Sequence, residues 1–396
     1  MANKTLEVYY HDMLVGTLAE ASDKRIAFQY SDSWIKNGFT ISPFSLPLTD
    51  TVYLPQIQNR DIFHGLFGVF ADSLPDSWGE VLLDRYLRTK GVDPGSITVV
   101  DRLSFVGNSG MGALEYRPSR AADFSVNGIA YDELAGECEK ILSSQESNRL
   151  DVLYRLGGSS GGTRPKVLIT EGGKDWIVKF PAKKDPSISG KREYDYSVCA
   201  KNCGILMTAT ELIPSKLGEG YFKTERFDRI GKEKVFSVTV AGLLEADFRA
   251  PSCDYSTFFK LIKILTRDNE KDKKQMYRMM CFNVLNHNRD DHTKNFSFLY
   301  TEEQGWRLSP AYDITYSDTF YGEQTTSVNG KGKDISDEDL ISVGVAAKLT
   351  KKFCRETLDM IREESAVFHF HSGGQRSILS LPLKYGTKDL CAKSQS

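Results

Sequence analysis

The sequence predicts an α+β fold of two or three packed units, in which strands concentrate before residue 229 and helices after it. Three observations support this prediction. Strand-like stretches open the chain, a loop–strand–turn–strand pattern lies near its middle, and apolar residues recur with helical spacing in its last third. A chain of 396 residues is also too long for one ordinary core.

Residues 1–115 form the first predicted unit, which is small and mixes strands with helices. The segments LEVYY and LVGTLAE flank a short break, which predicts a hairpin, and RIAFQY follows as another strand. A helical pattern then runs from IFHGLFG to RTKG. It is interrupted at SLPDS, where Ser73 or Asp76 can cap a helix and Pro75 stands near a helix start.

Residues 116–228 are predicted to hold a connector, with a helix near YDELAGECEKILSS, followed by a small lobe. In that lobe a glycine-rich loop leads to the strand VLIT, a tight EGGKD turn and the strand WIVKF, and a helix then ends at Gly204. Residues 229–396 are predicted to be mainly helical, with one strand pair in NFSFLYTEEQGWRLSP. Their helices are expected in STFFKLIKILTR, in KKQMYRMMCFNVLNHN and from DEDLISV to ESAVF.

Composition argues against several classes of protein. A net charge of −2 and a pI near 6.4 do not suit a dedicated nucleic-acid coat. A basic strip of Lys348, Lys351, Lys352 and Arg355 on a late helix fits a solvated helix face better than a DNA contact. Seven scattered cysteines without a CxxC pair are typical of free thiols in a reducing compartment. The chain shows no apolar leader and no long apolar run, so we expect a cytoplasmic protein that does not bind membranes.

The glycine-rich loop, RLGGSSGGTRPK, is the first candidate for a functional motif. Its glycines, at 157, 158, 161 and 162, would let backbone N–H groups approach phosphate oxygens closely. The loop fits neither a Walker A motif nor GxGxxG. A loop between strands is nevertheless how kinases cover the phosphates of ATP. The alternative interpretation is a flexible surface loop.

Lys179, in WIVKF, is the second candidate. On a strand it would share one face with Ile177, while Val178 and Phe180 occupy the other. Because burying an ammonium group is costly, a phosphate and a carboxylate are plausible partners. Glu193, on the next predicted helix, would supply the carboxylate, as in the strand-lysine and helix-glutamate pair of kinases. The alternative is a lysine on an edge strand, in water.

The run NHNRDDHTKN is the third candidate. Asp290 and Asn295 have the spacing of a kinase catalytic loop, in which the aspartate accepts or orients a substrate hydroxyl and the asparagine holds a metal ion. Asp291 competes for the first role but gives a shorter spacing. Asp313 follows across a predicted hairpin and would complete a Mg²⁺ site. Alternatively these residues are ordinary turn formers.

These motifs, in this order, are similar to those of HipA-family serine/threonine kinases, the toxin component of bacterial type II toxin–antitoxin systems. The stretches that carry the resemblance are GGSSGGTRPK, WIVKFP, ERFDR, NRDDHTKN and SPAYDI. The resemblance runs over nearly the whole chain. It implies a bilobal protein-kinase-like fold, with a β-rich N-lobe within 116–228, a helical C-lobe over 229–396 and a HipA N-terminal-like accessory subdomain over 1–115.

The resemblance also implies roles for individual residues. Asp290 and Lys179 would be catalytic, and Asn295 and Asp313 would hold Mg²⁺. Ser159 would be the inhibitory autophosphorylation site, although Ser160 stands beside it. The remaining implied role is ATP binding, and it falls to Ser160, Gly161, Gly162, Thr163, Arg164, Lys166, Lys179, Glu225, Arg226, Phe227, His292, Tyr312 and Asp313.

Asp291 departs from the pattern, because another member of the family has glycine there; its extra charge would bind metal or be solvated. The resemblance implies a protein substrate, such as an aminoacyl-tRNA synthetase, and a DNA-binding antitoxin of the HipB type, with DNA reached only through the antitoxin. Two other functions remain open. One is an inactive ATP-binding regulator or co-repressor scaffold, and the other is a small-molecule kinase on the same fold.

Overall fold

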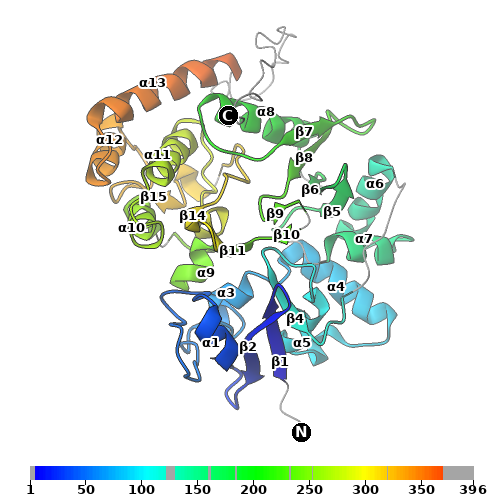
Figure 1. Ribbon diagram of the computed structural model, residues 1–396. Coiled ribbons are helices and arrows are strands. Elements are labelled where there is room, and N and C mark those ends of the chain that lie inside the picture. The colour runs from blue at the N-terminus through cyan, green and yellow to red at the C-terminus, as the bar shows by residue number, and fades with distance from the viewer. Residues whose placement is uncertain are drawn as a thin grey trace, which may run out of the picture.

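The computed structural model describes residues 5–121, 130–158, 162–182, 185–231, 233–251, 253–318 and 320–368 (Figure 1). None of the helices within these ranges has the length and apolar character needed to span a membrane. The accessory unit, which holds the elements between residues 5 and 117, lies at one end of the molecule, and helices α12 (Asp337–Ala346) and α13 (Lys351–Phe368) lie at the other (Figure 1).

The accessory unit is built on an antiparallel sheet with the strand order β3-β2-β1-β4. The predicted hairpin is confirmed, and His11 and Asp12 close it with positive φ angles of 46° and 64°. The strands are β1 (Thr5–Tyr10), β2 (Met13–Glu20), β3 (Ile26–Tyr30) and β4 (Leu114–Arg117). The helices are α1 (Asp32–Asn37), α2 (Asn59–Ile62), α3 (Gly68–Ala71), α4 (Ser77–Thr89) and α5 (Val99–Val106), with the 3-10 turn η1 (Pro94–Ser96).

The small lobe is a four-stranded antiparallel sheet in the order β5-β6-β8-β7. The two predicted strands are present as β5 (Lys166–Glu171) and β6 (Lys174–Lys179), and the predicted helix is α8 (Ser189–Asn202). The sequence did not predict the partners β7 (Thr210–Ile213) and β8 (Tyr221–Glu225). Two connector helices, α6 (Tyr131–Leu142) and α7 (Leu150–Gly157), precede the sheet.

The larger lobe carries its helices around a small antiparallel sheet, β11-β13-β14. The predicted helices are confirmed as α10 (Tyr255–Leu265) and α11 (Glu270–Leu285), and the helical tail is divided into α12 and α13. The remaining elements are β9 (Arg229–Ile230), β10 (Glu233–Lys234), β11 (Phe236–Thr239), α9 (Val240–Leu244), β12 (Cys253–Asp254), η2 (Thr293–Asn295), β13 (Ser297–Thr301), β14 (Gly305–Leu308), η3 (Phe320–Gly322) and β15 (Thr326–Ser327).

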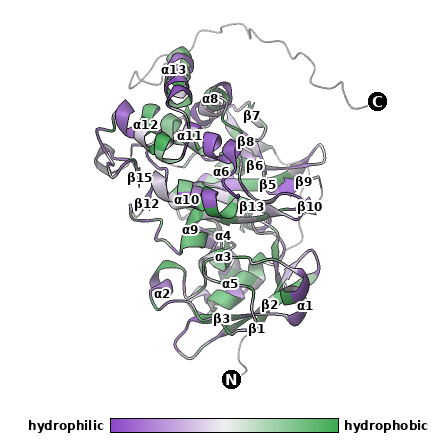
Figure 2. Ribbon diagram, turned by 60° about the vertical axis from the view of Figure 1, so that its left-hand side comes forward, coloured by the Kyte–Doolittle hydropathy of each residue, from purple (hydrophilic) through white to green (hydrophobic). Residues whose placement is uncertain are grey.

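Helix α13 shows how the larger lobe is packed. It carries hydrophobic and hydrophilic residues side by side (Figure 2). Its buried residues, which include Cys354, Leu358 and Ile361, pack toward α11, α12 and α8. Lys351, Lys352 and Arg355 are exposed, as a solvated helix face would require. Amphipathic burial of this kind fixes the helix against the lobe.

The accessory unit is joined to the rest of the chain by a shared core. Trp78, Leu82 and Leu87 of α4 pack with α6, α7 and the β5-β6 strands in one buried cluster. The strands of the accessory sheet belong to a second cluster that extends into the larger lobe. Both cores contain residues from either side of a predicted domain boundary, so they do not divide the chain at 115 and 228. These boundaries stay predictions.

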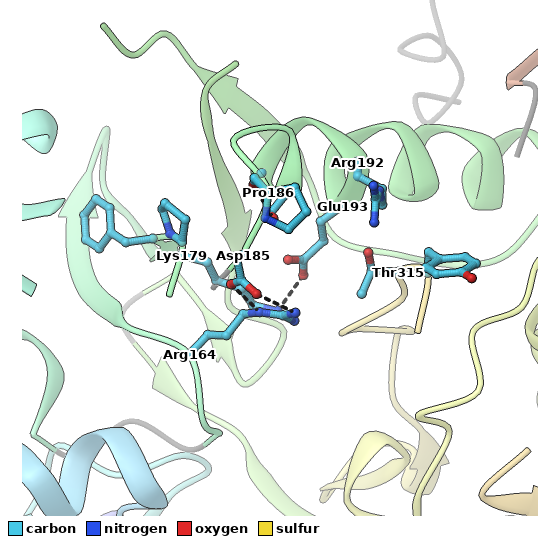
Figure 3. Close-up of a pocket in the computed structure, with 12 residues that line it drawn as sticks. Arg164, Lys179, Asp185, Pro186, Arg192, Glu193 and Thr315 are labelled. Carbon is cyan, nitrogen blue, oxygen red and sulfur yellow. Dashed lines mark hydrogen bonds and ion pairs between the residues drawn. The ribbon is translucent and has the colours of Figure 1, made fainter. Parts of the chain in front are cut away.

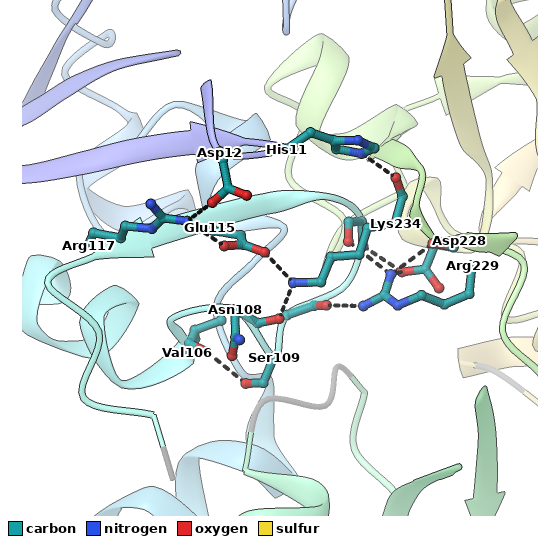
Figure 4. A network of polar contacts seen from close by, with 12 residues as sticks. His11, Asp12, Val106, Asn108, Ser109, Glu115, Arg117, Asp228, Arg229 and Lys234 are labelled. Carbon is teal, nitrogen blue, oxygen red and sulfur yellow. Dashed lines mark hydrogen bonds and ion pairs between the residues drawn. The ribbon is translucent and has the colours of Figure 1, made fainter. Parts of the chain in front are cut away.

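A polar network also holds the two parts together (Figure 4). The fully buried carboxylate of Asp228 accepts a hydrogen bond from the backbone N–H of Gly112 at 2.6 Å. Arg229 Nη1 donates to Gly112 O at 3.0 Å, and Lys234 Nζ donates to Glu115 Oε1 at 2.6 Å. Charge-assisted hydrogen bonds of this kind are short and strong, so they fix the accessory unit against the β9-β10 hairpin.

Candidate active site

Lys179 stands at the end of β6, with its side chain turned away from the core that Val178 enters. Its Nζ donates to Glu193 Oε1 of α8 and to Asp313 Oδ1, each at 2.5 Å. The side chain of Lys179 is 12% exposed and that of Glu193 is 8% exposed. The expected lysine–glutamate pair therefore exists, and Asp313 is the second carboxylate on the same ammonium group.

The charges of this triad shift the pKa values of its members. Burial lowers the pKa of Lys179, but the carboxylates of Asp313 and Glu193 outweigh it and raise that pKa above its usual value. The charge of Lys179 in turn holds the pKa of Asp313 well below its usual range, against burial. Burial raises the pKa of Glu193, which Lys179 opposes. Asp313 also has a positive φ of 54°, an unusual conformation for a residue other than glycine.

Lys166 lies directly opposite Lys179 in the register of β5 and β6. Its residue is 9% exposed. Burial and the neighbouring charge of Lys179 lower the pKa of Lys166 to about 8. The carboxylates of Asp313, Glu193 and Asp76 oppose this shift, so the two ammonium groups lie among acidic side chains.

Two of the four glycines predicted for the loop do not belong to it, because Gly157 is the last residue of α7 and Gly158 caps that helix; the described part of the loop begins at Gly162. Ser159, Ser160 and Gly161 lie outside the described residues. Gly162 has a φ of 89°, which favours glycine, and a Cβ there would lie 2.4 Å from Lys166 Nζ. Its backbone N–H donates to Asp76 Oδ2 at 2.7 Å. The loop therefore approaches the amine of Lys166 directly.

Thr163 and Arg164 are exposed beyond the loop. Arg164 makes a two-pronged ion pair with Asp185, with distances of 2.8 Å from Nε and 3.3 Å from Nη2 (Figure 3). This pair borders a hollow between the start of α8 and the segment that follows Asp313. The lining residues include Arg164, Lys179, Asp185, Arg192, Glu193 and Thr315.

Asp290 and Asn295 close the catalytic loop candidate. Asn295 Nδ2 donates to the backbone carbonyl of Asp290 at 2.7 Å, so the five-residue spacing is that of a compact turn. The side chain of Asp290 is 56% exposed, and His292 Nε2 lies 3.8 Å from its Oδ1. Partial burial raises the pKa of Asp290; His292 opposes this, and the charge of Asp313 adds to it. The loop thus presents an accessible carboxylate whose pKa is affected by the charge of Asp313.

Asp291 is not at the site, and the expectation that its charge would be solvated is wrong. Its side chain is fully buried and accepts hydrogen bonds from Tyr255 Oη at 2.7 Å, Gln324 Nε2 at 3.1 Å and the Thr326 N–H at 3.0 Å. Within the described residues, no group of three or more His, Cys, Asp or Glu could hold a metal ion. Through these buried hydrogen bonds, Asp291 anchors the Asp290–Asn295 loop to the larger lobe.

The stretch Glu225–Phe227 leaves β8 toward the larger lobe. Arg226 is buried and donates to Asp228 and to the carbonyl of Gly110, so its side chain turns toward the accessory unit. Phe227 lies beside Tyr312, with ring centroids 5.0 Å apart. The Tyr312 hydroxyl donates to Lys294 O at 2.6 Å. The Arg226 guanidinium is therefore engaged by protein partners.

A divalent metal ion fits the donors of Asn295 and Asp313 only in part. An ionised carboxylate and an amide oxygen are the hard ligands that Mg²⁺ prefers. Because the described residues provide no complete cluster of acidic ligands, phosphate oxygens and water would have to supply the rest. A metal that arrives with its nucleotide matches this donor set.

Sequence reasoning missed two contributors to the site. Asp76 was singled out only as a helix cap, and Lys294 was not considered. Lys294 Nζ donates to Asp76 Oδ1 at 2.7 Å, between the catalytic loop and the accessory unit. Their separation of 218 residues left no local signal in the sequence.

The fold is bilobal and protein-kinase-like, and the strand lysine Lys179 of the small lobe meets Asp313 of the larger lobe. The chain belongs to the HipA family. Residues 158–366 match the model of the HipA-like C-terminal domain, and residues 6–117 match that of the HipA N-terminal domain.

Two curated proteins of Sinorhizobium fredii (strain NBRC 101917 / NGR234) are similar to this chain. "Putative kinase Y4dM" is 26% identical over 393 residues, which cover 90% of each chain. "Putative kinase Y4mE" is 24% identical over 348 residues, which cover 79% of this chain and 77% of that protein.

Among solved structures, the chain is similar to one described as the Shewanella oneidensis MR-1 toxin–antitoxin system HipA, HipB and its operator DNA complex. The TM-score is 0.67 at 20% identity, over 92% of this chain and 91% of that one. At this identity the match shows the fold.

Proposed function

We propose that this protein is an ATP- and Mg²⁺-dependent serine/threonine protein kinase that acts as the toxin of a toxin–antitoxin pair. The observation that carries the proposal is the meeting of Lys179 with Glu193 and Asp313 beside the Asp290–Asn295 loop. The names of the two curated relatives support kinase activity in general.

In the proposed reaction, each residue has a role that its position permits. Lys179, held by Glu193, binds and orients the phosphates. Asp290, with its exposed carboxylate and raised pKa, orients the substrate hydroxyl and accepts its proton. Asn295 and Asp313 would hold Mg²⁺, which when bound neutralises charge on the phosphate oxygens. Such catalysis consists mainly of placement and charge stabilisation.

The partner is proposed from the solved relative, which is described with HipB and operator DNA. We expect an antitoxin of the HipB type, with DNA contacted through it. The protein substrate follows from the family resemblance, and an aminoacyl-tRNA synthetase is the class we propose.

Regulation by autophosphorylation is proposed at Ser159. A phosphate there would add about −1.5 to −2 charges beside the loop that receives the ATP phosphates. Repulsion between the phosphate on Ser159 and the phosphates of ATP should inhibit the enzyme.

The test is transfer of the γ-phosphate of ATP by purified protein. Wild type should label proteins of a cell lysate, and Asp290→Ala should not, although it keeps its affinity for ATP. Labelling of added metabolites instead of proteins would favour a small-molecule kinase. ATP binding without transfer would favour an inactive scaffold.

A further inference from the structure

We propose that Asp76, in the accessory unit, is a positioning residue that holds the glycine loop and the catalytic loop in the relative arrangement that binds ATP. The inference rests on the proposed function and adds a third part of the chain to the nucleotide site.

Asp76 occupies the N-cap position of α4, where Asp usually accepts a hydrogen bond from the first turn of its helix. Among the described residues, its side chain makes no such bond. One oxygen, Oδ2, instead accepts the Gly162 N–H at 2.7 Å, and the other, Oδ1, accepts Lys294 Nζ at 2.7 Å. Asp76 thus makes two long-range contacts in place of the local capping bond. Such departures from local capping preference are often found at functional sites.

Both partners belong to the site. Gly162 lies against Lys166 Nζ, and Lys294 stands between His292 and Asn295 on the catalytic loop. The side chains of Asp76 and Lys294 are 27% and 17% exposed, so water screens the pair only in part. Burial raises the pKa of Asp76, but Lys294, the Gly162 N–H and Lys166 together hold it below its usual value.

The surroundings make this contact rigid. Trp78, two residues on, donates from Nε1 to the carbonyl of Lys166 at 3.1 Å, so the same turn of α4 also holds the start of β5. Lys294 Nζ lies 4.2 Å from the centre of the Phe248 ring, and its carbonyl accepts the Tyr312 hydroxyl. With both ends fixed, the carboxylate sets the distance between the two loops.

A carboxylate on a loop N–H could instead compete with an ATP phosphate for that donor. Positioning and competition predict opposite changes in ATP affinity when the carboxylate is removed. Loss of a positioning carboxylate weakens ATP binding, because the loops must then be ordered by the nucleotide itself. Loss of a competitor strengthens it.

The test uses the full-length protein and measures binding of Mg²⁺ with a non-hydrolysable ATP analogue by calorimetry, beside KM and kcat for ATP. The variants are Asp76→Asn, Lys294→Met and the double mutant, with thermal unfolding recorded for each. Asp84→Asn is the matched control, since Asp84 is a carboxylate on the same helix that pairs with Arg102 at 3.0 Å, within the accessory unit.

We expect each single variant to raise both Kd and KM for the nucleotide about tenfold, the size typical of a lost charge-assisted hydrogen bond. We expect kcat to change less, and Asp84→Asn to match wild type. The double mutant should bind the nucleotide no more weakly than the single variant with the larger loss of affinity, because the two residues act as one unit. Should Asp76→Asn fail to fold, Lys294→Met breaks the same ion pair from the other side.

Unchanged or tighter nucleotide binding by a folded Asp76→Asn or Lys294→Met would overturn the inference, as would additive losses in the double mutant. These results leave the proposed function standing. A wild-type protein that binds no ATP would instead overturn the proposed function, and the inference with it.

Discussion

Lys179 Nζ and Asp313 Oδ1 lie 2.5 Å apart, although 134 residues separate them in the chain. This contact brings the small lobe and the larger lobe together at one point. The ammonium group also receives Glu193, so a single cation holds two carboxylates that would otherwise repel each other.

Replacing Lys179 by Met should abolish this arrangement. We expect phosphate transfer to fall at least about 100-fold, as when one preorganised electrostatic group is lost. The free energy of unfolding should fall by about 3 kcal/mol, because Glu193 is left buried without its partner. Lys174→Met is the control, since Lys174 lies on the same strand with a side chain that is 54% exposed. Full activity in Lys179→Met would contradict the assigned role.

Substitutions of Asp313 and Asp290 should distinguish loss of nucleotide binding from loss of phosphate transfer. Asp313→Ala is expected to weaken binding of Mg²⁺ with ATP as well as transfer, since it removes both a proposed metal ligand and a partner of Lys179. Asp290→Ala should lose transfer alone. Titration of both variants with ATP, with and without Mg²⁺, measures the difference. Equal Mg²⁺ dependence in the two variants would argue against Asp313 as a ligand.

Asp291 should make stability depend on pH. Burial raises the pKa of Asp291 from 3.8 to about 7 in the folded protein. Between these values the folded state binds a proton that the unfolded state does not, so the free energy of unfolding falls as the pH rises from about 4 to about 7. Asp291→Asn carries no titrating group at this position. The free energy of unfolding of wild type minus that of Asp291→Asn should therefore decrease over this window in urea titrations. A constant difference would refute the prediction.

Ser159 gives a prediction on regulation. After incubation with ATP, mass spectrometry should find phosphate on Ser159, accompanied by a loss of transfer activity. Ser159→Ala should remain active under the same conditions. Phosphate on Ser160 instead would move the site by one residue, and an unmodified loop in an active enzyme would remove the regulatory hypothesis.

Local sequence patterns predicted much of the fold. The hairpin around His11 and Asp12 follows from a short break between alternating segments, and β5, β6 and α8 follow from turn residues and spacing. The strands β7 and β8 were missed because their place in the sheet is decided by pairing, of β8 with β6 and of β7 with β8, and not by their own pattern.

The candidate site divides in the same way. Lys179 and Glu193 were paired correctly in the prediction because they lie only 14 residues apart on adjacent elements. Asp76 could be read as a cap but not as the partner of Lys294, because only the packing of α4 against the small lobe brings the two together. Asp291 looked like an exposed loop charge, and only its three buried donors reveal its structural role.

The central claim is that one nucleotide gathers Lys179, Asp290, Asn295 and Asp313 around its phosphates. A crystal structure with Mg²⁺ and a non-hydrolysable ATP analogue tests it most directly. We predict phosphate oxygens beside Lys179, a metal ion held by Asn295 and Asp313, and the carboxylate of Asp290 facing the γ-phosphate. A nucleotide bound elsewhere, or one whose metal ion touches neither Asn295 nor Asp313, would contradict the account.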